Sequence, residues 1–299
     1  MTTTALDLDY SPSSLVADLD RYLARYADDS ARARDTLRVH RGLPCGPLPE
    51  QRLDLFPAAE PGAPLMVFVH GGYWQELSRS EAAFAAADFV AAGISFAALG
   101  YGLAPRYRMR AITAMAADSV RRICAGRAEL PGAPSAVHLA GHSAGAHLVA
   151  SALLDTAGWQ AAGTDAAAEI ASATLISGVY ELEPLTRTYV NDALGMDAQE
   201  AREVSPLHRL TAGAGSEPGP VPGPGALPPL VIARGMHETD AFGRQQAAFA
   251  GAVRAAGGPA ADVNELVVAG RHHFDLPFDL GRPDTVLGAA VARAARFRR

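Results

Sequence analysis

The chain has 299 residues, of which 49% are hydrophobic and 19% charged, and its formal net charge is −6 at pH 7. Such a chain can bury a sizeable core, which excludes an intrinsically disordered protein. Its acidic balance, without a basic stripe, also argues against a nucleic-acid-binding protein.

The N-terminal sequence MTTTALDLDYSPSS lacks the basic start and apolar centre of a signal peptide, and no apolar run approaches a membrane span in length. Two cysteines, Cys45 and Cys124, are too few for a secreted disulfide framework. We therefore expect a cytoplasmic protein with reduced thiols and no membrane partner.

Helical and extended segments alternate along the chain. Residues 11–40 predict a helix, because serines precede leucines at a spacing of four, and residues 51–56 alternate like an edge strand. Continuous apolar runs predict buried strands at 64–70, 93–99, 135–140, 173–177, 229–234 and 264–269. Helices are expected between them at 79–92, 111–127, 144–155, 241–256 and 284–297. This alternation predicts an α/β fold with a mostly parallel sheet and helices on both faces, in three layers.

One stretch interrupts the alternation. Residues 211–229 are rich in proline and glycine, which excludes a helix or a central strand there. Because strands and helices resume after it, we expect a surface insertion within a single domain that spans residues 1–299.

A serine between two glycines, in AGHSAGAHL (140–148), follows the predicted strand 135–140. In a parallel sheet, reactive groups gather at the carboxyl ends of the strands. A nucleophile elbow needs a sharp strand-to-helix turn with small neighbours, which Gly141 and Gly145 supply. The sequence therefore predicts Ser143 as a nucleophile, although an inert serine in a tight turn would have the same pattern.

A nucleophilic serine needs a histidine held by a carboxylate, in the chain order serine, acid, histidine. Glu238 and Asp240 follow the strand at 229–234, and we expect Glu238 to be the acid, with Asp240 as the alternative. Two histidines follow the last strand, and we expect His273 rather than His272 to be the base.

The loop VFVHGGYW (67–74) follows an early strand, where an oxyanion hole is expected. Its candidate donors are the N–H groups of Gly71 and Gly72, together with that of Ala144 after the nucleophile. Tyr73 and Trp74, and also Tyr180, are expected to line a pocket for an aromatic ring, with the alternative that either Tyr73 or Trp74 packs under the loop in the core.

These motifs together resemble the α/β-hydrolase superfamily. HGGYW (70–74), GHSAGAHL (141–148) and HHFD (272–275) are similar to the kynurenine formamidase, or arylformamidase, branch. The resemblance implies Ser143 as nucleophile, His273 as base and Glu238 as acid. Members of this branch often carry Asp at the acid position, so the Glu is a departure from the pattern.

The resemblance implies a serine hydrolase that cleaves an N-formyl arylamine such as N-formylkynurenine and releases formate. A carboxylesterase or lactonase acting on a small ester is the alternative, because the motifs do not distinguish the bond cleaved. No cofactor is implied. The nine histidines include no metal-binding motif, so no metal site is expected. The expected partner is a small aromatic substrate, and a homodimer stays open.

Overall fold

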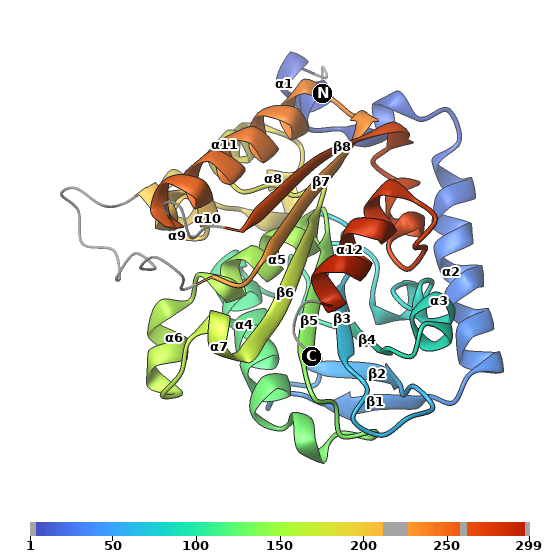
Figure 1. The fold of residues 1–299 in the computed structure, drawn as a ribbon. Coiled ribbons are helices and arrows are strands. Elements are labelled where there is room, and N and C mark those ends of the chain that lie inside the picture. Colours follow the sequence, from blue (N-terminus) through green and yellow to red (C-terminus); the bar gives the residue numbers. More distant parts are fainter. Residues whose placement is uncertain (1–3, 212–226, 258–261, 297–299) are drawn as a thin grey trace.

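The computed structural model describes residues 4–211, 227–257 and 262–296. Their strands form one eight-stranded sheet in the order β1-β2-β4-β3-β5-β6-β7-β8 (Figure 1). The pairs β1–β2 and β2–β4 are antiparallel, and all other neighbours are parallel. The strands are β1 (His40–Pro44), β2 (Arg52–Phe56), β3 (Leu65–Val69), β4 (Ser95–Leu99), β5 (Val137–His142), β6 (Ile170–Ile176), β7 (Leu230–His237) and β8 (Val263–His272).

Helices cover both faces of the sheet, so the predicted three-layer α/β architecture is confirmed. Figure 1 shows α2 (Leu19–Thr36), α3 (Ala86–Ala91) and α12 (Val286–Arg296) on one side. The other side carries α4 (Met109–Ala125), α5 (Ala144–Leu153), α6 (Thr156–Ala161), α7 (Ala166–Glu169), α9 (Ala198–Glu203), α10 (Pro206–Thr211) and α11 (Asp240–Gly257). Two short helices, α1 (Ala5–Asp9) and α8 (Asn191–Leu194), complete the set of described α-helices. None of the described helices is long and apolar enough to cross a membrane.

The sheet has a hydrophobic core on each face, because successive side chains along a strand point to opposite faces. On β3, Leu65, Val67 and Val69 belong to the core beneath α4, α5 and α11. Met66 and Phe68, which alternate with them, pack into the second core with α3 and α12. A strand buried on both faces must be apolar throughout, which explains why its sequence is a continuous hydrophobic run.

Four expectations about the elements need correction. The helix predicted at 11–40 is a short 3₁₀ turn (Pro12–Leu15) and then α2, and its last residue begins β1. Because β1 pairs outside β2, residues 51–56 are an inner strand and not an edge. The helix predicted at 79–92 is divided into a 3₁₀ turn (Arg79–Glu81) and α3. Several helices between residues 156 and 211 were not predicted. Most of the predicted insertion 211–229 lies outside the described residues.

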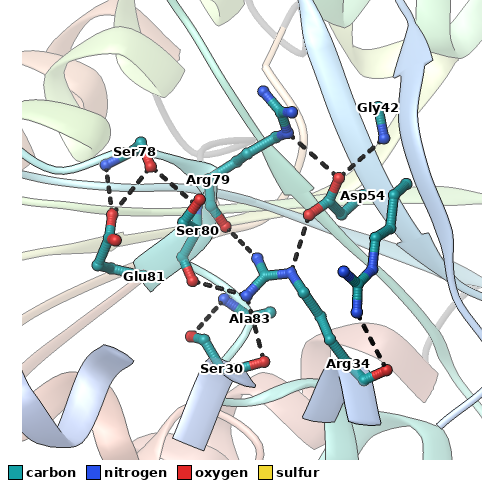
Figure 2. A network of polar contacts seen from close by, with 10 residues as sticks. Ser30, Arg34, Gly42, Asp54, Ser78, Arg79, Ser80, Glu81 and Ala83 are labelled. Carbon is teal, nitrogen blue, oxygen red and sulfur yellow. Dashed lines mark hydrogen bonds and ion pairs between the residues drawn. The ribbon is translucent and has the colours of Figure 1, made fainter. Parts of the chain in front are cut away.

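A buried polar network fixes α2 against the sheet (Figure 2). The Asp54 carboxylate on β2 accepts from Arg34 Nε of α2 at 3.0 Å, from Arg79 Nε at 3.2 Å and from the Gly42 N–H at 2.9 Å. The Arg34 guanidinium also donates to the carbonyls of Arg79 and Ser80, at 2.6 and 2.7 Å. Removing one partner of such a buried pair costs about 3–5 kcal/mol, so α2 is a firmly docked element.

Candidate active site

Ser143 lies at the turn between β5 and α5. Its backbone has φ 54° and ψ −118°, a left-handed φ that a non-glycine residue rarely adopts. The Ser143 N–H donates to the Ile176 carbonyl at 2.8 Å, which fixes the turn to β6. Strained backbone of this kind is concentrated at functional sites, because the surrounding structure must enforce it.

The two glycines beside Ser143 are required by close packing of α5. A Cβ on Gly145 would lie 2.0 Å from the Val69 carbonyl oxygen, and one on Gly141 would lie 2.4 Å from the Gly145 carbonyl oxygen. Both distances are far below any real carbon–oxygen contact. The pattern glycine, any residue, serine, any residue, glycine therefore has a steric cause at this turn: it lets α5 begin directly against β3.

His273 and Glu238 meet at the same edge of the sheet. Glu238 follows β7 and His273 follows β8, and His273 Nδ1 lies 3.1 Å from Glu238 Oε2. Their side chains are only 4% and 0% exposed. Glu238 Oε1 in turn accepts from the Ser177 hydroxyl at 2.7 Å and from the Gly235 N–H at 2.5 Å. The Ser177 hydroxyl and the Gly235 N–H thus hold the Glu238 carboxylate, and its other oxygen faces His273 Nδ1.

The alternative acid and base are engaged elsewhere. Asp240 is the exposed first residue of α11, and the described structure gives it no hydrogen bond to a histidine. His272 Nδ1 accepts from the Phe274 N–H at 3.1 Å, and its Nε2 lies 3.7 Å from Asp275. Of the two pairs of candidates, the structure therefore brings Glu238 and His273 together.

The oxyanion loop is held in a compact, strained form. Tyr73, Trp74 and Leu77 all have positive φ, at 46°, 60° and 65°. Gly72 has φ 97°, and a Cβ there would lie 2.3 Å from the Glu76 carbonyl oxygen, so only glycine fits. Within the described residues, the N–H groups of Gly72 and Ala144 donate to no group of the chain. Gly72 lines the cavity and Ala144 is buried, so both N–H groups are available to an incoming oxyanion.

Gly71 packs against the elbow itself. A Cβ on Gly71 would lie 3.2 Å from the Ser143 Cβ and 3.1 Å from the His142 carbonyl oxygen. His142 contacts His273, the candidate base: its Nε2 is 2.9 Å from the His273 carbonyl oxygen. Burial, and then the neighbouring His273, hold the pKa of His142 well below its usual value, so the ring is neutral. The position of His142 directly before Ser143 is the sequence signal for a supporting or packing role, and its contact with His273 agrees with such a role.

A cavity of about 280 Å³ contains both Ser143 and His273. It is lined by residues 72–73 and 75–77 of the loop after β3 and by Tyr189, Val190, His142 and Phe274. The N-terminal segment supplies the remaining wall, with Pro12, Ser13, Leu19, Leu23 and Tyr26. The sequence did not indicate that α2 would reach the site.

The structure separates the three aromatic residues expected to bind substrate. Tyr73 lines the cavity, and its hydroxyl donates to the Tyr10 carbonyl at 2.6 Å. Trp74 is fully buried in the core, where its indole N–H donates to His147 Nδ1 at 3.2 Å. Tyr180 is also fully buried, stacked on Phe249 with ring centroids 4.1 Å apart. Neither Trp74 nor Tyr180 lines this cavity, which corrects the expectation for both.

One group of side chains has the composition of a metal site. Ligand atoms of Glu181, Glu183 and His208 lie within 4.8 Å of one another, and all three residues are partly exposed. None of them lines the cavity that contains Ser143. They therefore have no geometric link to the candidate reaction.

The comparisons with known proteins agree with this architecture. A family model described as alpha/beta hydrolase fold matches residues 66–273. The chain belongs to the α/β-hydrolase superfamily, and it is a hydrolase. A putative thioesterase structure from a Silicibacter species superposes with a TM-score of 0.79 at 28% identity, covering 97% of this chain and 99% of that one. An esterase of Pyrobaculum calidifontis has the same fold, with a TM-score of 0.66 at 16% identity over 98% of this chain and 97% of its own.

Named relatives place the chain in one branch of the superfamily. The kynurenine formamidase of Danio rerio is 33% identical over 219 residues, which cover 71% of this chain and 72% of that protein. The kynurenine formamidase of Salmo salar is 32% identical over a stretch that covers 69% of this chain and 70% of that protein. An isoprenylcysteine alpha-carbonyl methylesterase of Arabidopsis thaliana is 29% identical and covers 80% of this chain and 57% of its own. The resemblance to the kynurenine formamidase branch is confirmed.

Proposed function

We propose that this protein is a serine hydrolase that cleaves the formamide of an aromatic, N-formylkynurenine-like substrate and releases formate. Ser143 is the nucleophile, His273 the base and Glu238 the acid. The observation that carries the proposal is the buried 3.1 Å contact between His273 Nδ1 and Glu238 Oε2, beside a cavity that also contains Ser143 in a strained turn. The kynurenine formamidases among the relatives support the formamide as the bond cleaved.

The chemistry follows from the tautomer that Glu238 selects. An ionised Glu238 accepts only a proton-bearing Nδ1, so the Nε2 of His273 is free to take the proton of the Ser143 hydroxyl. The Ser143 oxygen then attacks the formyl carbon, and the N–H groups of Gly71, Gly72 and Ala144 stabilise the oxyanion. Each such donor contributes about 2.7–4 kcal/mol to transition-state stabilisation.

The second half of the cycle reverses the proton transfer. His273 Nε2 gives its proton to the departing arylamine nitrogen as the carbon–nitrogen bond breaks, leaving formyl-Ser143. A water molecule, deprotonated by the same nitrogen, attacks the formyl ester and releases formate and the serine hydroxyl. His273 thus accepts and then donates a proton in each half of the cycle.

An esterase is the second candidate function. The methylesterase relative and the esterase structures favour it, because the same serine, histidine and carboxylate cleave esters. The test is formate release from N-formylkynurenine and from the uncharged 2-formamidoacetophenone, compared with p-nitrophenyl acetate turnover, by the wild type and Ser143→Ala. Cleavage of a formamide that requires Ser143 supports the proposal. Ser143-dependent ester cleavage without cleavage of either formamide would replace it with the esterase.

A further inference from the structure

The walls of the active-site cavity are aromatic and aliphatic on three sides. Leu19, Leu23 and Tyr26 come from α2, while Tyr73 and Phe274 approach from the oxyanion loop and from beside the base. This part of the cavity suits a flat aromatic ring, which is stabilised by burial against apolar and aromatic side chains. A charged substituent on that ring would instead meet the polar part of the cavity wall.

The charged side chains near the cavity are acidic. Glu76 is the one lining residue with an ionisable carboxylate, and it is exposed. The Asp7 carboxylate accepts from the N–H of Tyr189, another lining residue, at 2.9 Å. Hydrogen bonds from Thr4, and then from Tyr189, lower the pKa of Asp7, so this carboxylate is ionised at neutral pH. Asp7 does not itself line the cavity, so Glu76 supplies the one carboxylate among the lining residues.

No cation balances these charges among the lining residues, all of which lie in the described part of the chain. The sequence contains no lysine, so only arginine or a protonated histidine could serve. The neutral His142 is unsuited, since burial depresses its pKa, and His273 Nδ1 is engaged with Glu238.

No described arginine lines the cavity: Arg21, between the lining residues Leu19 and Leu23, is exposed to solvent, and several others pair with carboxylates elsewhere. On α2, the Arg25 guanidinium lies 3.8 Å from the centre of the Phe278 ring and pairs with Asp29. Arg106 pairs with Glu50 and Arg108 with Glu200. Arg187, which precedes Tyr189 by two residues, is exposed and does not line the cavity.

We propose that the site accepts aryl formamides and aryl esters that carry no anionic group, and that Glu76 sets this specificity. A substrate carboxylate would lose water at the rim without gaining a charged donor, and it would face Glu76. An ammonium group would be attracted by the same residue. This inference rests on the proposed function of Ser143 and narrows its substrates to uncharged or cationic aryl derivatives. N-formylkynurenine carries both an ammonium group and a carboxylate, and its carboxylate should make it a poorer substrate than its methyl ester, which keeps only the ammonium group.

The test compares kcat/KM for matched compounds at neutral pH and low salt. They are 2-formamidoacetophenone, N-formylkynurenine and the methyl ester of N-formylkynurenine, which share the reacting group and differ in charge. We expect the first and third to exceed N-formylkynurenine by at least about tenfold, a difference that one unpaired, desolvated charge readily produces. Equal or higher kcat/KM for N-formylkynurenine would overturn the inference.

Charge variants assign the effect to Glu76. Glu76→Arg should raise kcat/KM for N-formylkynurenine relative to its methyl ester, which differs only by the carboxylate, by at least about tenfold, and Glu76→Gln by a smaller factor. Glu60→Arg is the matched control, because Glu60 is an exposed acid between β2 and β3 that does not line the cavity. An equal change in this control would refute the role of Glu76.

An ester pair separates this inference from the formamidase proposal. Methyl 4-acetoxybenzoate and 4-acetoxybenzoate differ by one carboxylate, and their enzymatic rates are compared after division by their alkaline hydrolysis rates. If no formamide is cleaved, the formamidase proposal fails, and a preference of at least about tenfold for the neutral ester still supports the charge specificity. A preference for 4-acetoxybenzoate would overturn it.

Discussion

Replacing Glu238 by Gln should abolish the base without disturbing the packing of the site. Glu238 Oε1 accepts from the Gly235 N–H, a backbone donor that cannot become an acceptor, and from the Ser177 hydroxyl. In the variant, the single amide oxygen must stay with Gly235, so the amide NH₂ points toward His273 Nδ1. That nitrogen must then accept a hydrogen bond, and the imidazole proton moves to Nε2, toward Ser143. This tautomer is unable to take the serine proton, and kcat should fall by about 10³–10⁴-fold, or ~4–5 kcal/mol of activation free energy.

The assay is the steady-state turnover of p-nitrophenyl acetate, with unfolding by urea as the control for stability. Asp240→Asn is the matched variant, since Asp240 is exposed at the start of α11 and should lose less than about twofold in kcat. The reasoning is refuted if Glu238→Gln retains more than a tenth of the wild-type kcat. It is also refuted if Asp240→Asn is impaired to the same extent.

Two further predictions concern stability. Burial lowers the pKa of His70 to about 4 and of His147 to about 3, and it holds that of His142 well below its usual value. Below about pH 6.5 the unfolded chain therefore binds protons that the folded chain does not. As the pH is lowered further, the free energy of unfolding should fall by up to about 4 kcal/mol for each pH unit, since three histidines contribute. Urea midpoints measured between pH 7 and pH 4 should show this fall, and a flat profile would contradict it. Gly145→Ala should cost at least about 3 kcal/mol because its Cβ would overlap the Val69 carbonyl. Gly251→Ala, on α11 with no atom within 4 Å of the new Cβ, should gain about 0.5–1 kcal/mol, and similar urea midpoints for the two variants would refute the steric argument.

The sheet was predictable because its central strands are buried on both faces. The apolar runs at 64–70 and 173–177 coincide with β3 and β6 to within a few residues. β1 was not predictable in the same way. Its residues, HRGLP, include a charge, a glycine and a proline, and they form a strand only because β2 offers a paired edge and Asp54 accepts from Gly42. An antiparallel edge strand depends on such tertiary contacts more than on its own composition.

The aromatic residues of the site show where sequence reasoning reaches its limit. Tyr73 and Trp74 are neighbours, both with positive φ, and the sequence gives no reason to separate them. In the strained loop, Tyr73 lines the cavity and Trp74 donates to His147 in the core. Which of the two residues reaches the cavity therefore depends on the backbone of the turn and not on residue type.

The contribution of α2 to the opposite wall of the cavity was also not predictable, because α2 precedes the sheet and is distant in the sequence from Ser143, Glu238 and His273. Its docking by Arg34 and Asp54 brings Leu19 and Leu23 to the cavity that contains Ser143. The candidate catalytic residues follow the ends of strands, where the superfamily places them, and were open to prediction. The other residues that line the cavity come largely from a helix and a loop whose positions are fixed only by tertiary packing. Specificity in this protein must therefore be inferred from the charge and shape of the folded cavity, in which Glu76 is the one charged carboxylate among the lining residues described.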